Sequence, residues 1–231
     1  MSWIEDAMRA LVGMVESPTT PSTVQKEELP VEPPPERPAK TVLPFYPSER
    51  HIKYNQAPEK SLTTDTVESI AKARRLAEET GVLTPELGEH LLPIAMTEGW
   101  GAGMGIKGDN AFYASRRLKD SLRKMGLEDG TDYTTSYVKG EPHISPIPTD
   151  DNGPRLAAVI LGEKSKLKGI KTVEDAVKRY NGKGKAMEEY YGTTVPADVN
   201  VYWKKVSESK RLLDHPINAP LRKHFGSVYE K

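Results

Sequence analysis

Proline distribution is the feature of this sequence that most limits what it can fold into. Proline carries no backbone N–H donor and disrupts a helix interior, so a proline-dense stretch cannot form long helices or central strands. Such a stretch predicts an extended tether with polyproline II character, and we assign residues 17–61 to it. A folded domain is therefore expected after residue 61. Ten of the 19 prolines lie in the tether, at Pro18, Pro21, Pro30, Pro33, Pro34, Pro35, Pro38, Pro44, Pro47 and Pro58.

Residues 1–16, in front of the tether, form a short amphipathic segment. An isolated helix of this length is marginal in water and needs a surface to pack on. The pattern fits three surfaces: the chain's own domain, a partner protein, or a membrane surface, for which the basic face is thin. We interpret the segment as an anchor helix for a partner, with the first alternative left open. Its apolar residues at helical spacing are Trp3, Ile4, Ala7, Met8, Leu11, Val12 and Val15.

Residues 62–207 carry the pattern of one globular domain, for which we predict a mainly α (α+β) fold. Thr84-Pro85-Glu86 is a strong helix start, with a capping threonine, a proline at the first helical position and an acid in the first turn. Residues 132–146 alternate around Lys139-Gly140 and predict a small hairpin. The tail, residues 208–231, is polar and yields no prediction. Helices are predicted from Thr64 or Asp65 to Gly81, from Pro85 to Glu98 with a kink at Pro93, from Phe112 to Met125, from Pro154 to Lys166, and from a capping box at Thr172 and Asp175 to Gly182.

Composition excludes several classes of function. The 33 basic and 33 acidic side chains balance, so we expect no nucleic-acid partner. The absence of cysteine rules out disulfides, thiolate zinc sites and a cysteine nucleophile. We expect no integral membrane segment, because no apolar run is long enough, and no signal peptide, because acids come early. We also expect no metal and no cofactor, since no metal-ligand spacing joins His51, His90, His143, His215 and His224.

Glu98 stands at the point where an apolar helix pattern meets a glycine-rich loop. It follows Leu91 and Ile94 at spacings of seven and four residues, so we expect its side chain to point to the buried side. A carboxyl group in that environment tends to keep its proton, as a general acid must. The glycines that follow allow a ligand to approach the backbone. The simpler interpretation is that Glu98 is the first solvated residue of a helix end, and spacing alone leaves both open.

The helix predicted after Thr172 repeats this arrangement. Val173, Ala176 and Val177 form its apolar stripe, and Tyr180 ends the stripe just before Asn181. A phenol at the inner edge of a helix end can hydrogen-bond a buried carboxyl, and an asparagine can bind a sugar amide or hydroxyl. A core tyrosine followed by a helix cap is the alternative. Two helices that each end in such a group favour a shared functional site.

Four motifs follow one another along the chain: AMTEGWGAGMG, NGPRLAAVILGEKSKL, DAVKRYNGKGKA and VYWKKV. In this order they resemble the lysozyme-like lytic transglycosylases of the soluble type, including phage-borne members. The resemblance covers about residues 83–206, and it implies a lysozyme-like fold with Glu98 as the catalytic residue. It further implies substrate contacts from Gly103, Met104, Tyr180 and Asn181, and it matches Asn152 with Leu156–Ala158 to the family's asparagine-started helix and Tyr202 with Val206 to its closing motif.

The sequence also departs from the family pattern. Gly99 stands where the family has serine after the glutamate, and Gly105-Ile106 stands where it has glutamine. The insert after residue 109 is long, and its Asn110 and Tyr113 are candidate substrate contacts. These departures leave open two other interpretations: a structural virion or assembly protein with an inactive lysozyme-like fold, and a carbohydrate-binding module.

The activity implied by the resemblance is cleavage of the β-1,4 bond between N-acetylmuramic acid and N-acetylglucosamine in peptidoglycan. Glu98 would protonate the glycosidic oxygen and then act as base, either on the sugar's own 6-hydroxyl or on water. Most glycosidases use two carboxylates, and Asp109 is the one close in sequence. We interpret Asp109 as a turn residue, and we therefore expect a lytic transglycosylase with one catalytic acid.

Partners and location are expected to follow from the same resemblance. The substrate partner would be the glycan strands of peptidoglycan. The anchor helix and tether, residues 1–60, fit attachment to a protein partner or a virion, with a mobile bacteriolytic head. We therefore expect a virion-associated protein, or one delivered to the periplasm and cell wall.

Overall fold

The computed structural model describes residues 40–47, 60–98, 106–107, 116–138, 141–181 and 199–230. The chain divides into two compact units, Met1–Pro38 and Ala39–Lys231, and all described residues belong to the second. The predicted anchor helix and most of the predicted tether lie outside the described residues.

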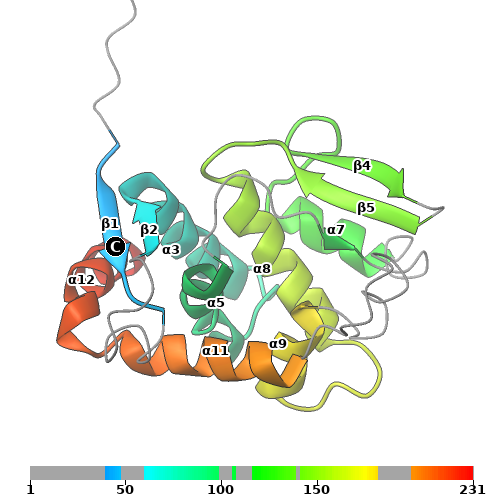
Figure 1. Cartoon of the computed structure of the whole chain (residues 1–231). Coiled ribbons are helices and arrows are strands. Elements are labelled where there is room, and N and C mark those ends of the chain that lie inside the picture. The colour runs from blue at the N-terminus through cyan, green and yellow to red at the C-terminus, as the bar shows by residue number, and fades with distance from the viewer. Residues whose placement is uncertain are drawn as a thin grey trace, which may run out of the picture. The chain divides into compact units, whose positions relative to one another are not determined.

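The second unit is mainly helical, as predicted, and it contains two small antiparallel sheets (Figure 1). None of the helices in the described ranges combines the length and apolar character needed to cross a membrane. The helices are α3 (Thr64–Glu79), α4 (Pro85–Gly88), α5 (Leu91–Glu98), α7 (Arg116–Lys124), α8 (Asn152–Ser165), α9 (Val173–Tyr180), α11 (Val199–Leu212) and α12 (Ala219–Tyr229), with the 3-10 turn η1 (Pro216–Asn218). The strands are β1 (Val42–Phe45), β2 (Lys60–Thr63), β3 (Ile106–Lys107), β4 (Tyr133–Val138) and β5 (Glu141–Pro146).

Local capping signals set the helix starts. Thr63 caps α3 by accepting a hydrogen bond from a backbone N–H of its first turn, one residue before the predicted cap. Thr84 caps α4 in the same way, with Pro85 at the first helical position. Thr172 and Asp175 form a complete capping box at the start of α9, as the sequence predicts.

The helix predicted from Pro85 to Glu98 is in fact two helices. α4 ends at Gly88 and α5 begins at Leu91, so Pro93 lies in the first turn of α5. A proline ring clashes with the carbonyl four residues earlier, which here belongs to Glu89. The interruption at Glu89–His90 removes that clash, because proline is tolerated in a first turn. The predicted kink is therefore a break.

Helix α8 occupies the middle of the domain. It packs against α3 and α9, and also against α7, while α12 covers the other side of α3 (Figure 1). α11 lies along one edge of the domain and packs on both α5 and α9. Every residue of α8 from Leu156 to Lys164 is buried.

The predicted hairpin is present, as β4 and β5 pair in antiparallel register with Thr135 opposite Ile144. β3 adds a short third strand on the other edge of β5. A second pair comes from the end of the segment assigned to the tether, where β1 pairs with β2 and Phe45 is fully buried. Proline is compatible with an edge strand such as β1, which contains Pro44. The folded unit thus begins before residue 62.

The C-terminal tail, for which the sequence yielded no prediction, folds onto the domain as η1 and α12. Leu221 and Phe225 of α12 are buried in the core. The Tyr229 hydroxyl donates to Glu78 of α3 at 2.7 Å, and the Arg74 guanidinium stacks on the Tyr229 ring at 4.2 Å. These contacts hold the C-terminal helix against α3.

A buried carboxylate joins α7 to α8. Glu163 is 1% exposed and accepts hydrogen bonds from Arg117 Nε at 2.5 Å, Ser121 Oγ at 2.8 Å and Lys166 Nζ at 2.9 Å. Burial alone would raise the pKa of Glu163, but the hydrogen bonds from Lys166, Ser121 and Arg117 outweigh it and hold the pKa below its ordinary 4.5. The cluster is therefore a stabilising contact at neutral pH.

We predict that Gly162→Ala lowers the free energy of unfolding by about 1–3 kcal/mol. A Cβ at this position of α8 would lie 2.2 Å from the Val82 carbonyl oxygen, and backbone cannot give way as a side chain does. Gly153, on the same helix, has nothing within 4 Å of an added Cβ. Gly153→Ala should be neutral or slightly stabilising in urea denaturation, and equal losses in both variants would contradict the close approach.

A second prediction concerns acid stability. Because the folded-state pKa of Glu163 is lowered, its contribution to stability is present above the ordinary 4.5 and is lost as the pH falls through the folded value. Glu163→Gln should cost about 3 kcal/mol at neutral pH, and this loss should shrink as the pH falls below 4.5. Urea denaturation across that range measures it. Glu128→Gln, at an exposed position, should change stability by less than about 0.5 kcal/mol. A loss at Glu163 that did not depend on pH would refute the assignment.

Candidate active site

Three helices that are distant in sequence bring their functional side chains to one place. α5 carries Glu98 as its last residue, α9 carries Tyr180 as its last residue, and α11 carries Tyr202 in its first turn. α11 packs on both other helices and holds them together (Figure 1). The charge of Glu98 acts on both phenols. Helices α5 and α9 thus both pack on α11, and the shared site of Glu98 and Tyr180 stays a prediction.

The burial predicted for Glu98 is wrong. Leu91, Ile94 and Ala95 of its stripe are fully buried, but the Glu98 side chain is exposed. The reason is that α5 ends at this residue, so its side chain passes the edge of the core instead of entering it. Exposure alone matches the simpler interpretation of a solvated helix end, and only the neighbours of Glu98 set it apart.

Tyr180 is the first of these neighbours. It is 7% exposed, and burial raises the pKa of its phenol well above 10, with a further rise from the Glu98 charge. Its backbone carbonyl accepts a hydrogen bond from the buried Lys164 Nζ of α8 at 3.2 Å. The phenol is therefore a neutral donor at any physiological pH, on a helix end that α8 holds in place.

Tyr202 is the second neighbour and is also 7% exposed. Burial raises the pKa of its phenol, and Tyr180 and the Glu98 carboxylate raise it further, the latter partly as a hydrogen-bond acceptor. Among the described residues, however, its hydroxyl has no partner at ordinary hydrogen-bond geometry. The structure therefore contains no well-formed hydrogen bond between Tyr202 and Glu98.

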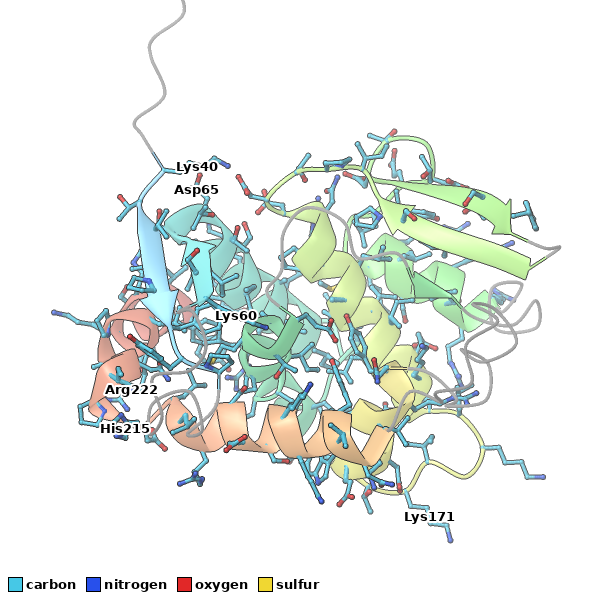
Figure 2. All side chains as sticks on the ribbon, in the orientation of Figure 1. Lys40, Lys60, Asp65, Lys171, His215 and Arg222 are labelled. Carbon is cyan, nitrogen blue, oxygen red and sulfur yellow. The ribbon has the colours of Figure 1, made fainter. Side chains whose placement is uncertain are left out.

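Lys60 and Ser209 hold the last turn of α5. Lys60 Nζ, from strand β2, donates to the Thr97 carbonyl at 2.7 Å, and Figure 2 shows its side chain directed toward α5. Burial lowers the pKa of Lys60, although the Glu98 charge opposes that shift. Thr97 Oγ1 lies 3.2 Å from Ser209 Oγ of α11. The residue before Glu98 is therefore fixed through both its backbone and its side chain.

The other predicted site residues have mixed outcomes. Gly103, Met104, Asn110 and Tyr113, and also Asp109, lie outside the described residues. Asn181 is the half-buried C-cap of α9, directly after Tyr180. It is close to the site by position, and no described contact of its side chain assigns it a role.

Asn152, which the resemblance matched to the asparagine-started helix, is a structural residue. It is 3% exposed, its Nδ2 donates to the Ile147 carbonyl at 3.1 Å, and its Oδ1 accepts from Arg155 at 2.7 Å. Its polar atoms thus join the end of the hairpin to the first turn of α8. They are used within the fold and do not face the site.

Lys60 was missed as a site residue, and Tyr202 was matched only to a motif. The sequence signal for Tyr202 was its helical spacing to Val206, which places both on the buried face of α11. Lys60 gave no signal, because it lies at the end of a proline-rich stretch and reaches α5 only through the pairing of β1 with β2. Within the described ranges, no group of three or more histidine, aspartate or glutamate side chains is arranged to hold a metal ion.

Comparison with known protein families, with curated proteins and with solved structures finds no match to this chain. The resemblance to lytic transglycosylases therefore rests on the motifs and their order alone.

We predict that Tyr202→Phe changes the stability of the protein by less than about 1 kcal/mol, because the hydroxyl that it removes lacks a well-formed hydrogen bond. The variant should also leave the phenolate absorbance that develops up to about pH 11 unchanged, since the raised pKa keeps Tyr202 neutral in that range. Spectrophotometric titration of wild type and variant measures this. A lower amplitude in the variant than in wild type would show that Tyr202 titrates freely.

Proposed function

We propose that this protein is a peptidoglycan lytic transglycosylase with a lysozyme-like fold, and that Glu98 is its one catalytic acid and base. The observation that carries the proposal is the meeting of Glu98 with Tyr180 and Tyr202 at the ends of three helices. Each motif alone is a common sequence pattern. An exposed carboxylate whose charge acts on two buried phenols is not what a solvated helix end requires.

The chemistry of the three groups suits glycoside cleavage. In the first step the Glu98 carboxyl donates its proton to the glycosidic oxygen, and the bond to the anomeric carbon breaks. In the second step the Glu98 carboxylate takes the proton of the muramic acid 6-hydroxyl, whose oxygen bonds the anomeric carbon and closes a 1,6-anhydro ring. Tyr180 and Tyr202, as neutral phenols, donate hydrogen bonds that orient the carboxylate between the two steps.

Because Glu98 is exposed, we assign the bound substrate the role of shielding its carboxyl group from water. A general acid needs surroundings that favour its protonated form. The described neighbours of Glu98 are two buried phenols and the Lys60 ammonium, which interact with its carboxylate form. A glycan strand lying across the exposed side would exclude water from the carboxyl group. The acid would then be completed by substrate binding, which confines its reactivity to the bound state.

The product depends on whether a second carboxylate takes part. Glu98 is the carboxylate whose charge acts on Tyr180, Tyr202 and Lys60. Asp109, the other candidate, lies outside the described residues. A one-carboxylate site favours the anhydro product over hydrolysis, because activation of water commonly uses a second acid.

Assembly into a larger particle belongs to the same proposal. The amphipathic segment at residues 1–16 would bind a protein partner, for example in a virion, and the proline-rich tether would give the catalytic head reach. This would place the protein at the cell wall or in the periplasm after delivery.

We predict that Glu98→Gln lowers the rate of glycan cleavage at least about 100-fold, because an amide can neither donate nor accept the proton. Purified peptidoglycan is incubated with each protein, and the released muropeptides are identified by mass. Wild type should release 1,6-anhydro products. The matched control, Glu79→Gln at the exposed end of α3, should act as wild type.

Other outcomes would replace the proposal. Cleavage that survives in Glu98→Gln removes Glu98 from the mechanism. Reducing-end products from wild type indicate a hydrolase with a second carboxylate. Glycan strands that bind the protein and stay intact indicate a carbohydrate-binding module, and no binding with stoichiometric incorporation into a particle indicates a structural component.

A further inference from the structure

We propose that Lys60 is a positioning residue for Glu98, and that it makes the site depend on a segment in front of the helical domain. We define the strap as residues 40–47 and 60–63, which contain β1 and β2. The proposal concerns regulation of the same site and rests on the proposed function for its effect on cleavage. The placement of Glu98 itself can be measured without any activity.

Helix α5 is too short to be stable without contacts from other elements. It has eight residues, and a helix of this length does not hold its own end in water. Its last carbonyls have no partner within the helix and need one from outside. Lys60 Nζ supplies it by donating to the Thr97 carbonyl at 2.7 Å (Figure 2). The geometry of Glu98, the next residue, follows from this bond.

The charge at the C-terminal end of α5 also favours a cation there. The C-terminal end of a helix carries partial negative charge, so a glutamate in the last turn is unfavourable there. The half-buried Lys60 ammonium places positive charge beside both the Thr97 carbonyl and Glu98. Burial and the nearby Lys205 of α11 disfavour that ammonium, whereas Glu98 favours it. Lys60 and Glu98 therefore stabilise each other in one arrangement.

A second connection joins the strap to Thr97. Ser209 of α11 lies 3.2 Å from the Thr97 hydroxyl and donates to the Pro47 carbonyl at 2.8 Å. Pro47 follows β1, as Lys60 begins β2. The residue before Glu98 is thus linked to both strands of the strap, through its carbonyl and through its side chain.

The strap is itself seated on the core. Phe45 is fully buried, the Tyr46 N–H donates to Asn218 Oδ1 at 2.9 Å, and Asn218 Nδ2 donates back to the Tyr46 carbonyl at 3.0 Å. A seated strap presents Lys60 at a fixed position. It follows that displacement of the strap would release the last turn of α5 and impair Glu98.

The test uses the full chain with three substitutions. Lys60→Met removes the charge and the donor at similar length, and Lys60→Arg keeps both. Lys171→Met is the matched control, since Lys171 points into solvent at another edge of the domain (Figure 2). On a soluble peptidoglycan oligosaccharide, Lys60→Met should lower kcat roughly 10- to 100-fold with KM changed less than about 2-fold. Lys60→Arg should restore kcat to within about 3-fold, and Lys171→Met should match wild type.

Amide hydrogen exchange is the readout that is independent of activity. In Lys60→Met, exchange in the last turn of α5 should become roughly tenfold faster, with α9 and α3 unchanged, and Lys60→Arg should reverse it. Wild-type exchange in Lys60→Met would overturn the proposal, as would equal acceleration in all three helices or no recovery in Lys60→Arg. A wild-type protein that does not cleave peptidoglycan would refute the proposed function and leave this measurement decisive for Lys60.

Discussion

The burial of α8 is the constraint on which the rest of the structure depends. Its residues from Leu156 to Lys164 have no solvent-facing side, so other elements must cover the helix all round. Two of the covered residues, Glu163 and Lys164, are ionisable and need partners, because an unpaired buried charge is costly. Glu163 takes its partners from α7 and from the end of α8, and Lys164 donates to the last carbonyl of α9. Core burial therefore fixes where α9 ends, and with it Tyr180.

Different parts of the structure position Tyr180 and Glu98, the two helix-end residues of the candidate site. Tyr180 is placed by the core, through the capping box that starts α9 and the lysine that meets its end. Glu98 is placed through Thr97, which contacts Lys60 of the strap and Ser209 of α11. Both helices have eight residues and cannot hold their own ends. In both, a lysine Nζ from another element donates to a last-turn carbonyl, where the helix dipole favours a cation.

The sequence could predict contacts between residues close in the chain, but not contacts between separate elements. Helix starts such as Thr84-Pro85 and Thr172 were predictable, because a cap is a contact between residues three apart. The hairpin was predictable from alternation around a Gly turn. From Pro93 the sequence predicted where the helix would be interrupted, but it predicted a kink where the structure has a break. Either one relieves the clash of the proline ring. The exposure of Glu98 and the role of Lys60 depend on where separate elements end in space, and no local pattern carries that information.

For the proposed function, the positioning of the site by both the core and the strap has a chemical consequence. In the second step of the proposed reaction Glu98 must be a correctly oriented carboxylate. Tyr180 and Tyr202 can donate hydrogen bonds to that carboxylate, and Lys60 places positive charge near it. The core thus supplies the hydrogen-bond donors, and the strap supplies the positive charge. Lys60 belongs to the segment that the proline pattern assigned to a tether, so a change in that segment would reach Glu98 through the hydrogen bond from Lys60 to the Thr97 carbonyl.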